Sequence, residues 1–154
     1  MDITITAIDR PTLLARKGTL HLTRFDIGFV SAYASGHAFL SVLHSSAEID
    51  LKRVRQRIVG RTLELGVSVN DAYDFRVIEG QGRDQIVPLG SAGAFSLEGR
   101  VVQHFISGEG SLFQVADDLI MLAVDMLPPD SLEVEVGTWV TFKTTELVFW
   151  VPQE

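Results

Sequence analysis

The chain contains no cysteine, which excludes disulfide bonds, thiolate metal ligands and a cysteine nucleophile together. Long apolar runs are also missing, since the longest, residues 119–124, falls far short of the roughly 20 residues that a membrane-spanning helix needs. The amino-terminal residues lack the basic stretch followed by an apolar stretch that is typical of a secretory signal. These absences predict a soluble domain with no membrane partner, and a cytoplasmic location fits them.

Positive charge is scarce in the second half of the chain. Residues 1–77 carry ten Lys and Arg against eight Asp and Glu, whereas residues 78–154 carry three against twelve, and the formal net charge is −7. Proteins that hold a nucleic-acid backbone need clustered positive charge, because binding is driven by the release of counterions. The composition therefore disfavours nucleic acid as the main partner. The asymmetry indicates either solvated surface charge or faces of opposite sign that guide a partner or another copy of the chain.

Apolar residues recur mainly with a period of two, which is the spacing of a strand with one buried face. Thirteen glycines and several polar breaks divide the chain at strand-length intervals. The alternating segments are Ile3 with Ile5, residues 63–69, residues 132–136, and Val140 with Phe142. We therefore expect a mostly β fold.

Three segments depart from this alternation. Residues 38–43 and 119–127 are apolar on both faces, which predicts central strands covered on each side. The second of these includes Asp125, which could mark a bulge, a strand end or a buried hydrogen-bonded carboxylate. Residues 46–58 are predicted to form a helix or helical turn, the one short helix that we expect, because Ser46 is a suitable N-cap and apolar residues then recur at helical spacing. The alternative is a strand with Arg53, Arg55 and Arg57 on one face.

The order of the segments suggests an internal repeat of two β units. Residues 18–78 and 99–151 each fit three meandering strands, a connection and a two-strand hairpin, the strand count of a small barrel of the OB or SH3-like kind. The first unit would span residues 1–78, residues 79–98 would be a glycine-rich linker with an entry strand, and residues 99–154 would form the second unit. The alternatives are one domain of about ten strands and a chance likeness between the halves.

Signals for catalysis or metal binding are weak. On a strand, His37 and His44 point to opposite faces, and His21 and His104 could meet each other only through tertiary packing. No nucleophile elbow and no phosphate-binding glycine motif is present. We therefore predict no metal and no cofactor and assign no catalytic residue. A small enzyme that pairs a histidine with a carboxylate in a cleft is an alternative.

A basic cluster is the most concentrated feature of the chain. It supplies five of the thirteen positive charges, on Lys52, Arg53, Arg55, Arg57 and Arg61. Such a cluster suits an anion, RNA or an acidic partner, because guanidinium groups make planar, bidentate contacts with oxyanions. The competing interpretation is an amphipathic connection whose basic face pairs with the acidic second half. The cluster also lacks the interleaved aromatic residues that base stacking uses.

The C-terminal segment has aromatic side chains on both faces of a predicted strand. Phe149 and Trp150 are neighbours and point to opposite sides, and Trp139 is expected to face outward. A strand that is apolar on both faces needs cover on both, from this chain or from another. We therefore predict a non-enzymatic interaction module that associates with itself or another protein through Trp139, Phe149 and Trp150. Burial of Trp139 within one chain, and an anion or nucleic-acid binder based on the basic cluster, are the alternatives.

Overall fold

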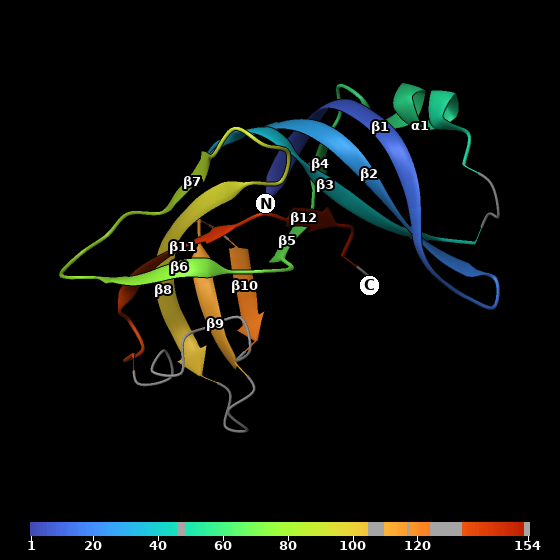
Figure 1. Cartoon of the computed structure of the whole chain (residues 1–154). Coiled ribbons are helices and arrows are strands. Elements are labelled where there is room, and N and C mark those ends of the chain that lie inside the picture. The colour runs from blue at the N-terminus through green and yellow to red at the C-terminus, as the bar shows by residue number, and fades with distance from the viewer. Residues whose placement is uncertain (46–48, 105–109, 117, 124–133, 153–154) are drawn as a thin grey trace.

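The computed structural model describes residues 1–45, 49–104, 110–116, 118–123 and 134–152. In this part of the chain the strands form two sheets, and one helix, α1 (Leu51–Ile58), lies beside the first sheet (Figure 1). The first sheet contains, in spatial order, β4 (Thr62–Glu64), β1 (Asp2–Lys17), β2 (Leu20–Ser31), β3 (Ser35–His44), β12 (Leu147–Trp150) and β5 (Gly66–Val69). The second contains β10 (Asp118–Ala123), β9 (Gly110–Val115), β8 (Phe95–His104), β11 (Trp139–Thr144) and β6 (Tyr73–Ile78), while β7 (Gln85–Pro88) pairs with β8 outside this order. The predicted mostly β fold is confirmed.

The first sheet curls strongly along β1 and β2. The pairing of these two strands is antiparallel, and its register shifts after Ile5, after Asp9 and after Leu13. Bulges of this kind bend a strand and increase its twist, which agrees with the curved ribbon that Figure 1 shows. The predicted opening strand at Ile3 and Ile5 is confirmed, and it continues to Lys17.

The two ends of the first sheet belong to one segment of the chain. β4 pairs with β1, β5 pairs with β12, and only Leu65 separates β4 from β5. The Leu65 amide donates a hydrogen bond to the Met1 carbonyl at 2.9 Å, which extends the contact with β1 beyond β4. The paired strands therefore run in a ring from β1 through β2, β3, β12 and β5–β4 back to β1. This is a barrel-like arrangement, as the sequence predicts.

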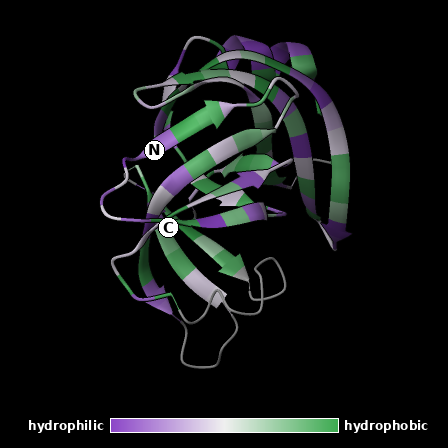
Figure 2. Cartoon of the chain, turned by 60° about the vertical axis from the view of Figure 1, so that its left-hand side comes forward, coloured by the Kyte–Doolittle hydropathy of each residue, from purple (hydrophilic) through white to green (hydrophobic). Residues whose placement is uncertain are grey.

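Alternating side chains from both sheets meet in one hydrophobic core, and Figure 2 shows hydrophobic and hydrophilic residues taking turns along the strands. In the first sheet, the rings of Phe29 and Phe149 pack edge to face with centroids 4.9 Å apart. In the second, Phe113 and Phe142 pack in the same manner at 5.9 Å. Phe29 also contacts Phe95 of β8 at 5.8 Å. The cores of the two sheets are therefore continuous.

The chain crosses between the sheets twice, from β5 to β6 and from β11 to β12. Asp71 lies in the first crossing, and its carboxylate accepts hydrogen bonds from the second. The donors are the Thr144 hydroxyl, the Thr145 amide and hydroxyl, and the Glu146 amide, at 2.8 to 3.2 Å. Partial burial raises the pKa of Asp71, but these hydrogen bonds outweigh it and hold the pKa below its ordinary value of 3.8. One carboxylate thus ties the two crossings together.

The predicted central strand at residues 119–127 is wrong in its described part. β10 lies at the edge of the second sheet and pairs, among the described residues, with β9 alone. Leu119 and Met121 are each more than half exposed, so one face of β10 is not covered by the described part of the chain. The rest of this segment, including Asp125, lies outside the described residues.

Three further strand predictions have mixed outcomes. The alternation at Val140 and Phe142 is confirmed, since both side chains are fully buried in β11. The strand predicted at residues 132–136 is wrong for residues 134–136, which form a bend and a turn before β11, and residues 132–133 lie outside the description. Residues 38–43 lie in β3, in the middle of the first sheet, but Leu43 is 45% exposed and is not covered on its outer face.

The two sheets do not correspond to the two predicted β units. β5 and β6 both lie within residues 1–78 but belong to different sheets, and the same is true of β11 and β12 within residues 99–154. The glycine-rich residues 79–98 contain β7 and the beginning of β8. The division into two units and the internal repeat therefore stay predictions.

Candidate ligand-binding cleft

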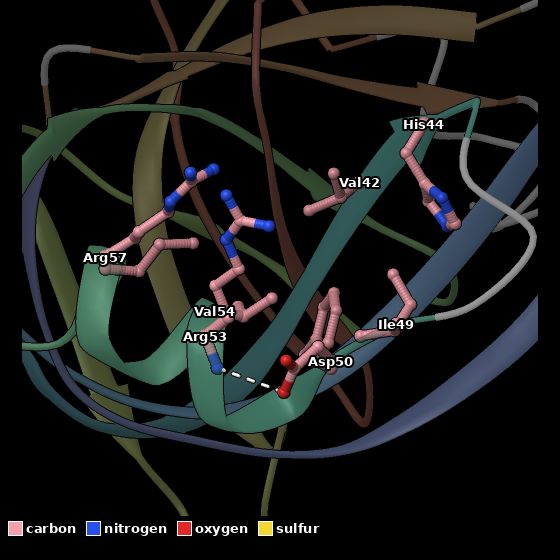
Figure 3. Close-up of a pocket in the computed structure, with 9 residues that line it drawn as sticks. Val42, His44, Ile49, Asp50, Arg53, Val54 and Arg57 are labelled. Atoms are coloured by element: carbon pink, nitrogen blue, oxygen red, sulfur yellow. Dashed lines mark hydrogen bonds between the residues drawn. The ribbon is translucent and has the colours of Figure 1, made fainter.

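A cleft of about 390 Å³ opens between α1 and the inner face of β2 and β3. Phe25 of β2 and Val42 and His44 of β3 form one wall of this cleft. Strand alternation points them to the same side as the buried core residues Ile27 and Leu40. This wall is therefore the interior of the barrel, and the cleft is the mouth of the barrel at its α1 end (Figure 3).

Apolar residues of the helix form the opposite wall. Val54 and Ile58 are four residues apart, so they share one face of α1, and both line the cleft together with Ile49. All three are partly buried against the main core. The cleft is therefore apolar on both sides.

The helix begins later than the sequence predicts. Its N-cap is Asp50, whose carboxylate accepts a hydrogen bond from the Arg53 amide at 3.3 Å, the dashed line in Figure 3. The predicted helix over residues 46–58 is confirmed only from Leu51 to Ile58. The predicted cap, Ser46, lies outside the described residues. Either residue type can cap a helix, so the choice between them depends on tertiary contacts.

Two arginines of the basic cluster lie at the cleft. Arg53 and Arg57 are four residues apart and share a helix face, and Figure 3 shows their guanidinium groups projecting to the same side of α1. Both side chains are exposed, and neither forms an ion pair with a described residue. The cleft therefore combines apolar walls with two cations that form no ion pair with a described residue, and with the Asp50 carboxylate.

The other three members of the basic cluster lie elsewhere. Arg55 binds β1, because its guanidinium group donates to the Ile8 carbonyl at 3.0 Å and to the Asp9 carboxylate at 3.1 Å. Lys52 and Arg61 are exposed, do not line the cleft and form no ion pair with a described residue. The predicted cluster thus divides into a cleft pair, a structural anchor and two surface cations.

His44 belongs to a pair of stacked imidazoles. Its ring lies 5.5 Å from that of His21 on the neighbouring strand, and its Nε2 atom shares a hydrogen bond with the Thr23 hydroxyl at 2.7 Å. The Nδ1 atoms of both rings are buried and have no hydrogen-bond partner among the described residues. Sequence reasoning missed this pair, because only the register of β2 against β3 brings the two residues opposite each other.

The described histidines do not form a catalytic arrangement. His37 is exposed, and His104 shares a hydrogen bond with the Ser111 hydroxyl at 2.6 Å and contacts the Val134 carbonyl. Ser111 is fully buried, so a substrate cannot reach it in this conformation. Within the described ranges no histidine is hydrogen-bonded to a carboxylate, and no three metal-ligating side chains gather. This geometry adds no support to the enzyme alternative.

The three predicted interface residues occupy different environments. Phe149 is fully buried in the core, so its assignment to an interface is corrected. Trp139 is partly buried, with the Arg100 guanidinium group 5.8 Å from its ring centroid. Trp150 is 41% exposed. Of the three, Trp150 is therefore the most exposed.

Trp150 lies on the outside of the barrel beside other apolar side chains. Its indole ring packs so closely on Gly66 of β5 that a Cβ atom at Gly66 would collide with it. Leu22 of β2 and Leu43 of β3 are directly opposite each other. A hollow of about 350 Å³ is lined by these leucines, Trp150 and Val151, together with Ser41 and Val42 of β3. We call these four residues (Leu22, Leu43, Trp150 and Val151) the outer stripe.

No helix in the described part of the chain has the length and apolar character needed to cross a membrane. No protein-family model, curated protein or solved structure matches this chain. Any functional conclusion therefore depends on the geometry of the cleft and of the outer stripe.

Proposed function

We propose that this protein is a non-enzymatic binding module that holds an anionic ligand in the cleft between α1 and the barrel. The observation that carries this proposal is that Arg53 and Arg57 share the mouth of an apolar cleft and lack acidic partners among the described residues. Charge interactions are stronger beside apolar walls than in open water, which favours an anion at this position.

The connectivity of the first sheet supports a binding role, because it fits an OB-like barrel. β4 and β5 act as one interrupted strand, β12 runs parallel to β3, and α1 lies between the third and fourth strands of the ring. Residues 70–146 are then an insertion between the fourth and fifth barrel strands. OB barrels bind ligands through one face and the adjoining loops. A division into barrel and insertion is our alternative to the predicted pair of β units.

The test compares variants with equal changes in charge. Inorganic phosphate, anilinonaphthalene sulfonate and single-stranded RNA are titrated at low salt into the wild type, the Arg53→Ala/Arg57→Ala variant and the Lys52→Ala/Arg61→Ala variant. We expect at least one anion to bind the wild type, with an affinity that falls about ten-fold or more in the Arg53/Arg57 variant. The Lys52/Arg61 variant loses the same charge outside the cleft, so it should bind almost as well as the wild type. Equal losses in both variants, or no binding of any anion, would contradict the proposal.

Self-association is a second candidate function, and the outer stripe favours it. Trp150, Leu43 and Val151 are each 41 to 51% exposed and contiguous, and they lie on the outside of the barrel. Exposed apolar patches of this kind often mark protein interfaces. The test is sedimentation of the wild type and Trp150→Glu over a range of concentrations, with Val77→Glu as a control at an exposed residue of β6. A dimer weakened only by Trp150→Glu supports the candidate, and a monomer at every concentration contradicts it.

A further inference from the structure

We infer that the ligand of the cleft is an amphipathic organic acid, whose carboxylate lies between Arg53 and Arg57 and whose apolar body enters the barrel mouth. This inference rests on the proposed function and names the chemical class of the ligand. The cleft has a polar rim at one side and an apolar interior, so it matches a molecule with one charged end. Ligand pockets in proteins commonly show this combination of apolar walls and a few polar groups.

The direction in which the wall residues point supports an inserted ligand. Phe25, Val42 and His44 face the barrel interior, whereas a surface patch would be lined by outward-facing residues of the same strands. Val54 and Ile58 close the cleft from the helix. A ligand that only touched the arginines would leave these apolar walls in water. Burial of its apolar body against them supplies most of the binding free energy.

The charges around the cleft favour one small anionic group over a polyanion. Arg53 and Arg57 are the only members of the basic cluster that line it, since Arg55 is bound to Asp9 and Lys52 does not reach it. Asp50 also lines the cleft and would repel a second negative charge. A nucleic-acid backbone needs a row of cations, whereas only two Lys or Arg side chains of the described residues line this cleft. A carboxylate fits the two guanidinium groups, which bind planar oxyanions well.

The size of the cleft limits the ligand. About 390 Å³ lies at the lower end of the range of roughly 300 to 1,000 Å³ that ligand sites occupy. An unbranched acid therefore gains affinity with each added methylene only until the cleft is full. Each buried methylene should tighten binding about four-fold. A plateau in this series measures the depth of the cleft.

The experiment is calorimetric titration of the whole chain with butanoate, hexanoate, octanoate, decanoate and dodecanoate, and with octanol as the uncharged match of octanoate. We expect affinity to rise about four-fold for each methylene, then level off, and octanoate to bind more tightly than octanol. Arg53→Ala/Arg57→Ala should remove the preference for octanoate over octanol without changing the dependence on chain length. A variant that loses the preference for octanoate but keeps the dependence on chain length would show that the head group and the tail occupy different parts of one site.

A variant that fills the cleft gives an independent test. Val42→Phe places a larger side chain on the inner wall, so the longer acids should lose their advantage over butanoate. Val77→Phe introduces the same change at an exposed residue of β6 and should bind as the wild type does. Far-ultraviolet circular dichroism and thermal unfolding check that both variants fold.

The outcomes separate this inference from the proposed function. If carboxylates bind without dependence on chain length, or if phosphate or RNA alone binds in an Arg53/Arg57-dependent manner, the amphipathic ligand is overturned and the anion-binding function stands. If octanol binds as well as octanoate to the wild type, the carboxylate is not recognised and the inference is overturned. If no anion of either panel shows dependence on Arg53 and Arg57, both proposals are overturned together.

Discussion

The two sheets are built from the same kind of alternating strand, yet the side chains on their inner faces are buried to different extents. In the second sheet Phe95, Phe113 and Phe142 are fully buried against the common core. In the first sheet the strands close into a ring, and Val42 and His44 at its α1 end are only partly buried. A helix of eight residues is about 12 Å long. Such a helix covers only part of a barrel mouth, which is why the first sheet has a cleft at that end.

The chain carries a natural reporter in each sheet. Trp150 lies in β12 of the first sheet and Trp139 in β11 of the second. Variants that keep only one of these residues, Trp139→Phe or Trp150→Phe, allow the unfolding of each sheet to be followed by fluorescence.

The largest expected effect comes from the shared core. Phe149→Ala in the first sheet and Phe142→Ala in the second should each lower the free energy of unfolding by about 3–5 kcal/mol, because each removes a fully buried ring. Since the cores meet through Phe29 and Phe95, both tryptophans should report one common transition in either variant. Denaturant titration of the single-tryptophan proteins checks this. If Phe142→Ala shifts the Trp139 transition alone, the sheets unfold independently.

The joint between the sheets should depend on Asp71. Asp71→Ala leaves the fully buried Thr144 hydroxyl without its acceptor and should cost about 3 kcal/mol. The pKa of Asp71 is lower in the folded chain than its ordinary value of 3.8, so its contribution is complete well above that pH and is lost as pH falls toward the folded pKa. The stabilities of the wild type and the variant should therefore differ most at neutral pH, and the difference should narrow as the pH falls below 3.8 toward the folded pKa. A difference that stays constant down to acid pH would show that the carboxylate is not responsible.

Substitution of one glycine in each sheet by alanine tests how tightly the neighbouring strands pack. A Cβ atom at Gly99 in β8 would collide with the Gln114 carbonyl of the neighbouring strand, which is backbone and cannot move aside. A Cβ atom at Gly66 in β5 would instead meet the Trp150 ring, which is partly exposed and can turn outward. Gly99→Ala should therefore cost about 2 kcal/mol and Gly66→Ala less. Gly66→Ala should also change the emission of Trp150, and equal costs without that change would contradict this account.

The smallest expected effect concerns the helix that borders the cleft. Asp50→Ala removes the N-cap and should destabilise α1 by about 1 kcal/mol, seen as faster amide hydrogen exchange in residues 52–55. Asp50→Ser removes the same charge but keeps a capping hydroxyl, so exchange should stay close to that of the wild type. Fast exchange in both variants would mean that the charge, rather than the cap, stabilises the helix.

Local spacing predicted several of the strands but not which strands lie next to them. Alternation correctly places Ile5, Val67 and Phe142 in strands with buried faces. It could not place residues 119–123 at a sheet edge, because an apolar strand has the same composition whether or not a neighbour covers it. The pairing of Trp150 with Gly66, which helps to close the barrel, depends on contacts between distant segments.

The sequence predicted the candidate site only as a cluster of positive charge. It showed that Arg53, Arg55 and Arg57 lie close together in the chain, but not which of them line a cleft. Arg55 differs from the other two because β1 presents the Ile8 carbonyl and the Asp9 carboxylate to it, and that contact exists only in the folded chain. The inner wall of the cleft was also hidden, since the direction of Val42 depends on how the sheet curls.

The most direct measurement of the central claim is a crystal structure of the chain soaked with a terminally brominated octanoate. Our account predicts a carboxylate between Arg53 and Arg57 and an anomalous bromine peak inside the barrel mouth, near Phe25 and Val42. Bromine on the outer stripe beside Trp150, or a carboxylate held by Lys52 and Arg61 with the cleft unchanged, would contradict it.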